Sequence, residues 1–543
     1  MSQKSAKQNR RVQELEALLQ QSEQEKAELQ EEVKRLQQKM DRLTEQFLNA
    51  QRARFGQSSE KKKYVMDGAE QVQLFNEAEV TQNPKAEEPT IEEVTVAAHK
   101  RKKKRTYEEL TEGLPEEEIL LELKGDQLVC AKCGGTLRLI GKKFVKSEII
   151  YIPAQVKLLK YFACTYACDQ CEKKTGFANI VGTVAPPSLM KHSLASPSSV
   201  AEVMTKKYVD GVPLTRQEKI WKREGIELSS ATLANWVIQT SQNWLKPLYR
   251  RLKHALLEST VIHADETVVQ VLKEDGKKAS SQSRMWVYAS PERGGKAIRY
   301  FEYQPDRKGI RATEFLRGYH GCLVTDGYSG YDQVEGVTRC GCWAHMRRKW
   351  REAMPKGATM QTSQAAVGYN YCNKLFALEK KFSGMNSQNR KFARQAEAEP
   401  LLDAYWLWLK TLDPMPGSKL EEAVTYANNQ REYLCAFLQH GEVEISNNPA
   451  ENAIRPFVVG RKNWLFSDTP KGADSSAIVY TLVETAKANG IDPYAYLLRV
   501  LSLLPYFGKS PSNEELDQLL PWHQRMRESL LFKDNSNRVG GAE

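Results

Sequence analysis

The chain has 543 residues, of which 41% are hydrophobic and 27% are charged, and this length exceeds what one hydrophobic core supports. No stretch approaches the roughly 18 uninterrupted apolar residues of a membrane helix, and the N-terminus runs straight into polar sequence, so we expect neither a membrane anchor nor a signal peptide but a cytoplasmic protein. The net charge of +11 suits a polyanionic partner such as DNA, although a merely soluble basic protein is the alternative.

Residues 1–53 are predicted to form a coiled-coil helix. Apolar residues recur at alternating spacings of three and four, with Ser22 and Lys26 as polar interruptions of the seam. A helix this polar cannot bury itself alone, so we expect self-association as a dimer or a higher oligomer; the alternative is a lone helix packed on the rest of the chain. The seam positions are Val12, Leu15, Leu19, Ser22, Lys26, Leu29, Val33, Leu36, Met40, Leu43 and Phe47.

Residues 54–118 have the composition of a flexible linker with an acidic and a basic part. Residues 64–98 hold eight acidic side chains against the single Lys85, and prolines and serines interrupt any periodicity. Six consecutive basic residues follow at 100–105, and they indicate either a solvated tail or a sequence-independent DNA contact. The candidate DNA-binding residues of this block are Lys102, Lys103, Lys104 and Arg105.

Residues 119–190 are predicted to form a zinc-binding domain. Two Cys-x-x-Cys pairs supply the four thiolates that a closed, structural Zn²⁺ site requires. The 34 residues between the pairs exceed the usual spacing, Cys164 could replace one ligand, and unrelated thiols are the alternative. Ten cysteines in a chain of this kind do not indicate a disulfide scaffold. The predicted ligands are Cys130, Cys133, Cys168 and Cys171.

Residues 191–255 are predicted to be helical and to contain a helix-turn-helix. One helix stops near Gly225, and Ser229 or Ser230 can cap a second helix over 231–242. A short glycine-containing turn between two helices is typical of a DNA reader, whose second helix enters the major groove. Helical hairpins without DNA contacts are the alternative, and basic residues on the first helix favour DNA: Arg216, Lys219, Lys222 and Arg223.

Residues 256–354 carry two carboxylates at the ends of predicted strands, Asp265 and Asp326. The predicted strands are 261–265, 285–288, 298–301, 322–327 and 337–340, and the predicted helices are 312–318 and 343–354. Three strands, a helix, a strand and a helix is the order of a ribonuclease H-like α/β domain, in which the first and fourth strands are neighbours. The two carboxylates would then repel each other unless cations neutralise them, and two Mg²⁺ or Mn²⁺ ions that clamp a phosphodiester are the usual solution.

Five stretches together resemble the transposases of the IS-sixty-six family of bacterial insertion sequences, which are DDE-type enzymes. The stretches are HADET at 263–267, TDGYSGY at 325–331, CWAH at 342–345, NNPAENAIRP at 447–456 and GRKNWLF at 460–466. The resemblance extends from the heptad region to the LLPW motif at 519–522, which is nearly the whole chain.

The resemblance implies that Asp265, Asp326 and Glu451 bind the catalytic metal ions and that the cysteine pairs belong to the family's zinc-binding domain. Glu451 lies 125 positions after Asp326, a larger separation than in retroviral-type integrases, and we interpret 355–440 as a helical insertion. The second part of the catalytic domain is then 441–510, and 511–543 is a C-terminal tail. Members of the family are usually encoded beside small accessory proteins, which are possible partners.

The residues around Glu451 agree with this assignment. Pro449 is tolerated in a first helical turn, and Asn448, Glu451 and Arg455 then share one helix face. This pairing could position either Glu451 for metal or Arg455 for the scissile phosphate. Residues expected to contact DNA near the cut are Arg455, Arg461, Lys462 and Trp464, with a core role as the alternative for Trp464.

Three neighbouring groups of residues are not assigned to catalysis. Glu266 follows Asp265 directly on a strand and points to the opposite face. Cys342 and His345 offer only two metal ligands, which we interpret as structural support. His263 shares the face of Asp265, but a packed histidine is the expected role.

The sequence therefore predicts a multidomain α+β protein: a DNA transposase that binds the terminal inverted repeats of its element and the target DNA. It would catalyse metal-dependent phosphodiester hydrolysis and strand transfer. A catalytically silent DNA-binding regulator derived from a transposase is the first alternative, and a structure-specific nuclease of the same fold is the second.

Overall fold

A computed structural model describes the following residues: 19–29, 31–32, 35, 39, 142, 155–168, 177, 179–292, 296–355 and 358–530. The chain divides into two compact units. The first comprises Met1–Lys63, Pro186–Ile220 and Glu227–Ser529, and the second comprises Tyr64–Ala185, Trp221–Ile226 and Leu530–Glu543. Among the helices that are described, none has the length and the apolar character needed to cross a membrane.

The described part of the second unit contains a small antiparallel hairpin of β1 (Thr165–Cys168) and β2 (Asn179–Gly182). Cys168, one of the predicted zinc ligands, is the last residue of β1. The other three predicted ligands and the basic block at 102–105 lie outside the described residues. Most of the predicted coiled coil does too, but residues 19–29 are helical, as the heptad pattern predicts.

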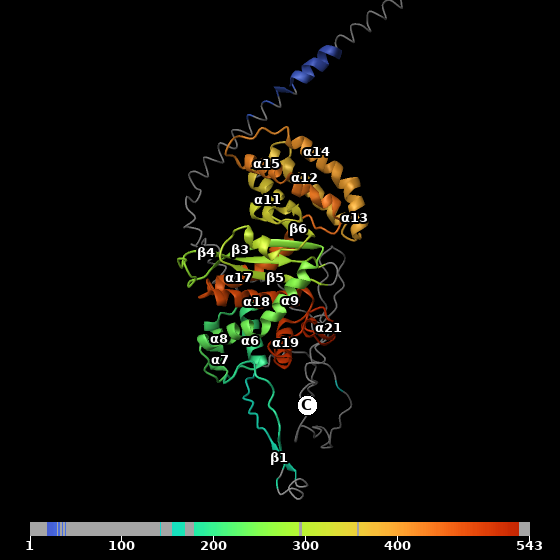
Figure 1. Ribbon diagram of the computed structural model, residues 1–543. Helices are drawn as coiled ribbons and strands as arrows, with labels where there is room; N and C mark the ends of the chain where they lie inside the picture. The colour runs from blue at the N-terminus through green and yellow to red at the C-terminus, as the bar shows by residue number, and fades with distance from the viewer. Residues whose placement is uncertain are drawn as a thin grey trace, which may run out of the picture. The chain divides into compact units, whose positions relative to one another are not determined.

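A five-stranded sheet forms the centre of the first unit (Figure 1), with the order β5-β4-β3-β6-β7. Its strands are β3 (Val261–Gln270), β4 (Gln282–Ala289), β5 (Arg299–Gln304), β6 (Cys322–Thr325) and β7 (Thr338–Gly341). β3, β4 and β5 are antiparallel neighbours, whereas β6 and β7 run parallel to β3. The predicted adjacency of the first and fourth strands of this domain is therefore confirmed.

Several predicted element boundaries were wrong by a few residues, and two of them have a clear physical reason. β3 does not end at Asp265 but continues to Gln270, because it pairs with β4 along its whole length, up to Gln270 opposite Gln282. The predicted helix over 312–318 is α10 (Ile310–Phe315). The chain leaves this helix before Gly318, whose φ of +81° is a left-handed conformation that favours glycine.

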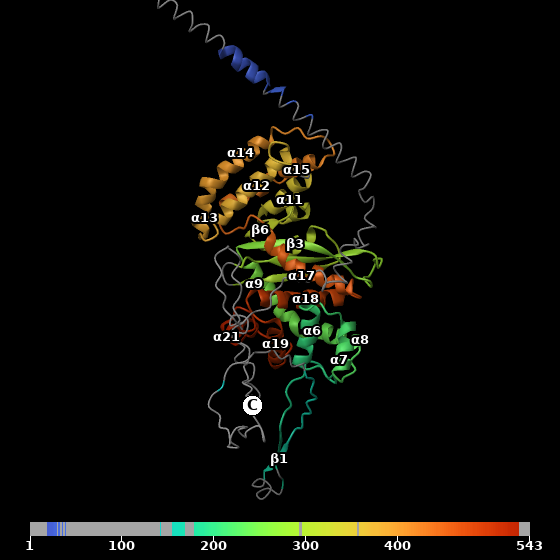
Figure 2. The same cartoon turned by 180° about the vertical axis from the view of Figure 1, so that it is seen from behind.

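The predicted helical insertion packs on one face of the sheet. It follows α11 (Trp343–Ala353) and contains α12 (Gln364–Lys381), α13 (Ser387–Ala393), η5 (Arg394–Ala398), α14 (Glu399–Leu409), α15 (Lys419–Asn429), α16 (Arg431–Ala436) and η6 (Phe437–Gln439). Val261, Val324 and Cys340 of the sheet join its aromatic core. Both views show these helices on one side of the sheet (Figure 1, Figure 2).

The opposite face is covered by α17 (Asn448–Trp464) and α18 (Pro470–Ala488). α18 lies along the edge strand β5, whose outward backbone groups would otherwise be open to pairing with another chain. The Thr481 hydroxyl accepts a hydrogen bond from the Phe301 amide at 2.8 Å, and Thr485 accepts one from the Arg299 amide at 3.1 Å. These threonines provide hydrogen-bond partners for two backbone amides of the edge strand in place of a further strand.

The remaining helices surround α18 or follow the sheet. They are α6 (Pro197–Tyr208), α7 (Leu214–Arg223), α8 (Ser230–Thr240), η3 (Ser241–Leu245), α9 (Lys246–Leu257), η4 (Ser329–Gln333), α19 (Pro493–Phe507), α20 (Asn513–Asp517) and α21 (Gln524–Leu530). The predicted pair of helices corresponds to α7 and α8, with Gly225 at φ +95° between them. Ser229 caps α8 by accepting a hydrogen bond from the Thr232 amide.

Candidate functional site

Asp265 and Asp326 come from neighbouring parallel strands. Asp265 lies in the middle of β3, and Asp326 directly follows β6. The last parallel pair of these strands is His263 beside Val324, two residues before each aspartate. Because side chains alternate along a strand, both carboxylates project from the same face of the sheet at the same level.

Glu451 enters from α17. Its backbone amide bonds to the Asn447 carbonyl in the first turn of the helix, and Pro449 occupies a first-turn position, as predicted. Proline there loses no helical hydrogen bond, since the first amides of a helix have no partner within it. The carboxylate therefore lies at the start of a well-defined helix.

Asn447 holds this helix start against the sheet. It is fully buried, its side-chain amide donates to the Ala264 carbonyl at 2.8 Å, and its oxygen lies 3.3 Å from His263 Nδ1. Its backbone amide donates to the Cys342 thiol at 3.1 Å. Sequence analysis did not single out Asn447; the signal was its place in the NNPAEN motif, four residues before Glu451.

The three carboxylates influence one another electrostatically. The pKa of Asp265 is raised to about 7, first by burial and then by the negative charges of Glu266, Asp326 and Glu451. A buried carboxyl group whose pKa is raised by neighbouring negative charges favours either a proton or a cation beside it.

Glu451 has a second set of neighbours on α11. Its carboxylate lies 3.6 Å from His345 Nδ1 and 3.6 Å from the Arg348 guanidinium. Possible ligand atoms of Cys342, His345 and Glu451 all lie within 4.8 Å of one another, so the structure adds Glu451 to the pair that we interpreted as structural support. Its observed ionic neighbour is Arg348, whereas Arg455 on the same helix is exposed.

The donor set fits a divalent cation. Carboxylate oxygens are the ligands that Mg²⁺ and Mn²⁺ prefer. Glu451 Oε1 and His345 Nδ1 are buried without a hydrogen-bond partner in the described part of the chain, a situation that is costly unless something else binds them. Burial also lowers the pKa of His345, which keeps its imidazole neutral and able to coordinate.

Glu266 and His263, the neighbours of Asp265, are oriented and buried as the sequence predicts. The Glu266 carboxylate turns away to accept hydrogen bonds from Arg307 at 2.6 Å and from the Tyr331 hydroxyl at 2.8 Å. His263 is fully buried, and burial lowers its pKa to about 3. It is therefore a neutral, packed residue that contacts Asn447.

The predicted DNA contacts in the described part of the chain differ in exposure. Arg216, Lys219, Arg455 and Lys462 are exposed, and Arg461 is half-buried. Trp464 is half-buried as well, with its ring edge-on to Tyr208 at 6.3 Å between centroids and with Lys207 Nζ over its face at 5.3 Å. These contacts favour the core alternative for Trp464.

Comparison with known protein families identifies the family of this chain. Residues 192–475 match the model described as "Transposase IS66 family". The chain belongs to the IS66 transposase family. The IS66 C-terminal element matches 481–522, the zinc-finger binding domain of transposase IS66 matches 127–172, and a model described as "Transposase C of IS166 homeodomain" matches 42–119. The zinc-finger match contains all four cysteines that sequence analysis selected, and the family resemblance stated above is confirmed.

Curated relatives of this IS66 family member include uncharacterized proteins of Sinorhizobium fredii. One of them, y4qI, is 31% identical over 364 residues, which are 64% of this chain and 66% of that protein. Another, y4hP, is 29% identical over 417 residues, which are 72% of this chain and 73% of that protein. The chain therefore spans just under two thirds of y4qI and almost three quarters of y4hP.

Proposed function

We propose that the chain is a DNA transposase that cleaves the ends of its insertion sequence and joins them to target DNA, with Asp265, Asp326 and Glu451 as ligands of two divalent ions. The observation that carries this proposal is the pKa of Asp265 on β3, which is raised to about 7 by burial and by the negative charges of neighbours that include Asp326, directly after β6, and Glu451 on α17. Membership of the IS66 family supports the transposase class.

The sheet supports a ribonuclease H-like catalytic domain. Its order, with three antiparallel strands followed by two parallel ones, agrees with the order expected from the sequence. The insertion between β7 and α17 explains why Glu451 lies so far from Asp326 in the chain. In the proposed site α17 supplies the third carboxylate.

When bound, Mg²⁺ or Mn²⁺ ions would activate the attacking water or 3′-hydroxyl and stabilise the departing 3′-oxygen. The protein's part is to fix the ligands: Asp265 and Asp326 by the register of β3 and β6, and Glu451 through Asn447. Arg348, whose side chain is 54% exposed beside Glu451, is placed to contact a DNA phosphate. Arg455 and Lys462, both exposed on α17, extend this basic surface.

For recognition of the element ends we propose the helices α6 to α8. Arg216 and Lys219 are exposed on α7 and would bind phosphates without reading sequence. The exposed positions of α8 include Asn235 and Gln239, and these side chains pair with adenine in the major groove. The zinc-binding domain and the basic residues Lys102 to Arg105 would add contacts.

Self-association through the N-terminal helix is part of the proposal. Leu19 and Leu29 occupy predicted seam positions, and in the single chain their side chains are 63% and 65% exposed. Burying such leucines against a second copy would remove apolar surface from water. A transposase must also bring two element ends together, and it would do so in the bacterial cytoplasm, where the chromosome lies.

The proposal is tested by strand transfer of labelled element-end DNA in Mg²⁺, with the accessory proteins of the element supplied. We expect joined product from the wild-type chain and none from Asp265→Ala or Glu451→Gln, although both variants should still bind the DNA. Glu352→Gln is the matched control, because Glu352 is an exposed acid on α11. DNA binding without cleavage or joining by the wild-type chain, in Mn²⁺ as well, would favour the silent regulator instead.

A further inference from the structure

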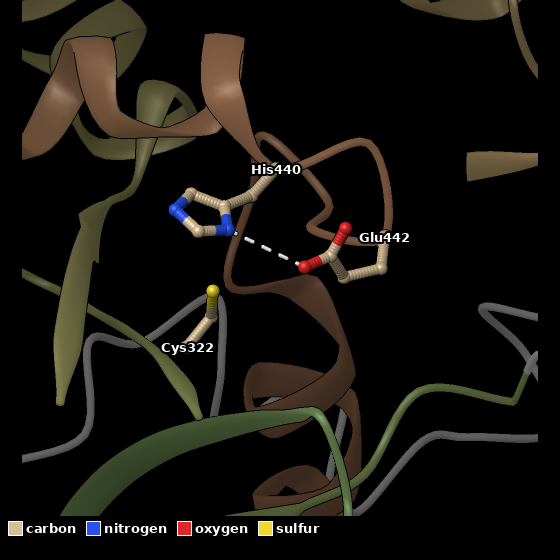
Figure 3. A group of neighbouring side chains, drawn as sticks. All are labelled: Cys322, His440 and Glu442. Atoms are coloured by element: carbon tan, nitrogen blue, oxygen red, sulfur yellow. Dashed lines mark hydrogen bonds and ion pairs between the residues drawn. The ribbon is translucent and has the colours of Figure 1, made fainter. Parts of the chain in front are cut away.

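A second cluster of metal-ligating side chains lies at the other end of β6 from Asp326. Cys322 is the first residue of β6, and His440 and Glu442 belong to the segment 440–447, which connects η6 to α17. Possible ligand atoms of the three side chains all lie within 4.8 Å of one another. Figure 3 shows the thiol, the imidazole and the carboxylate converging, with His440 Nδ1 at 3.3 Å from Glu442 Oε1.

Cys340 on β7 lies beside this group, but its thiol is not among the ligand atoms that all lie within 4.8 Å of one another. In the parallel register Cys322 lies beside Thr338 and Val324 beside Cys340, so the two cysteines are diagonal neighbours on one face of the sheet. The Cys340 thiol itself lies 3.8 Å from the Thr338 carbonyl oxygen. If the Cys340 side chain turned toward the group, two thiols, one imidazole and one carboxylate would form a set of four ligands that suits tetrahedral Zn²⁺ and is too soft for Mg²⁺.

The segment that carries His440 and Glu442 is fixed in place by Arg394. This arginine is fully buried and pairs with Glu379, with its Nε at 2.7 Å from one carboxylate oxygen. It donates hydrogen bonds to the carbonyls of Phe437, His440 and Val443, at 3.0, 2.8 and 2.8 Å. The backbone on both sides of the two ligands is thus held before any ion binds.

Gly441, between the two ligands, shows how closely this segment is packed. A Cβ at this position would lie 1.7 Å from the Ser387 carbonyl oxygen. The segment is therefore set by its surroundings, which is the preorganisation that a metal site needs.

The burial of the four donors suits a closed site with an entry path. Cys322 and Cys340 are buried, at 4% and 1% exposure, whereas the side chains of His440 and Glu442 are 31% and 36% exposed. Buried cysteines beside an apolar core are often only small hydrophobic residues. Here, however, Cys322 faces two polar side chains at the rim, so an ion arriving from solvent meets three grouped donors, with the Cys340 thiol next to them on the sheet.

We propose that Cys322, Cys340, His440 and Glu442 bind a structural zinc ion, in addition to the zinc of the zinc-finger domain. With four protein ligands the site leaves no position for a reacting water. It joins β6 and β7 to the segment that leads into α17, and thereby connects the strand before Asp326 to the helix that carries Glu451. Binding releases the protons of the thiols that coordinate.

The test is the zinc content of the full-length chain, measured by mass spectrometry of the elements after dialysis against metal-free buffer. Cys322→Ser and His440→Ala should each lose about one equivalent of zinc per chain relative to the wild type. The zinc-finger domain is the same in all variants, so the difference isolates this site. His254→Ala is the matched control, since His254 is exposed on α9, and it should lose none. Equal zinc in the wild type and Cys322→Ser would overturn the proposal.

Two further measurements keep the proposal testable if a variant fails to fold. His440→Cys should retain the zinc, because a thiolate can replace the imidazole. In the wild type, peptide mapping after thiol alkylation should label Cys322 and Cys340 only once a chelator has been added, and adding zinc back should protect them again. A disulfide between the two cysteines, or labelling that ignores chelator and zinc, would overturn the proposal.

Discussion

Asn447 is the residue whose loss should reveal most directly how the site is held together. In Asn447→Ala the Ala264 carbonyl and His263 Nδ1, both buried, lose the partners that lie at 2.8 and 3.3 Å. Each buried polar group left without a partner costs about 1–3 kcal/mol. We therefore expect the free energy of unfolding to fall by about 2–5 kcal/mol, more than is usual for a single polar substitution.

Urea unfolding followed by tryptophan fluorescence measures this effect selectively. All ten tryptophans lie between residues 221 and 522, so the signal excludes the N-terminal 190 residues. With a dependence of about 3 kcal/mol per molar urea, the midpoint should fall by roughly 1 M. The same variant should also lose strand transfer at temperatures where it remains folded, because Asn447 positions the helix that carries Glu451.

Asn452→Ala is the matched control for this experiment. Asn452 is exposed on the same helix, so its removal should change the midpoint by little, in keeping with about 0.5 kcal/mol or less for exposed positions. If Asn447→Ala shifted the midpoint no more than Asn452→Ala, the idea that Asn447 fixes the start of α17 would be wrong.

Two further predictions concern stability. Burial raises the pKa of Glu302 from 4.5 to about 7; the folded protein therefore binds more protons than the unfolded chain between these values, and stability falls as pH rises through that window. The free energy of unfolding of Glu302→Gln should equal that of the wild type below pH 4.5 and should exceed it by about 3 kcal/mol above pH 7. Equal free energies of unfolding at every pH, measured by urea titration, would contradict this. Gly368→Ala should destabilise the protein by about 1–3 kcal/mol, because the added Cβ would lie 2.5 Å from the Trp350 ring. Gly384→Ala is the control and should leave stability unchanged, because no atom lies within 4 Å of its Cβ. Equal thermal unfolding midpoints for the two variants would refute the packing argument.

The strands of the sheet could be predicted because their signals are local. β-branched runs near Asp265 and Asp326 predict the strands β3 and β6. The order of the elements predicts that these two strands are neighbours, and their parallel pairing confirms it. The end of β3 at Gln270 was missed because it depends on pairing with β4, which the sequence of one strand does not contain.

Glu451 could be assigned only through the family motif. A helical insertion separates it from the aspartates, and no periodicity connects residues that far apart. The same reason hides Asn447 and Arg348, whose importance comes from contacts between elements: a buried amide between β3 and α17, and a guanidinium on α11 beside Glu451. Helical spacing suggested that Glu451 pairs with Arg455, but its ionic neighbour in the structure is Arg348 on another helix.

The most direct test of the central claim is strand transfer by Asp326→Cys, compared in Mg²⁺ and in Mn²⁺. A thiolate is a poor ligand for the hard Mg²⁺ ion and a better one for the softer Mn²⁺. If Asp326 holds a catalytic ion, the variant should join no DNA in Mg²⁺ and should recover activity in Mn²⁺. Joining at the wild-type level in Mg²⁺ would contradict the claim, because the carboxylate would then not be needed to bind metal.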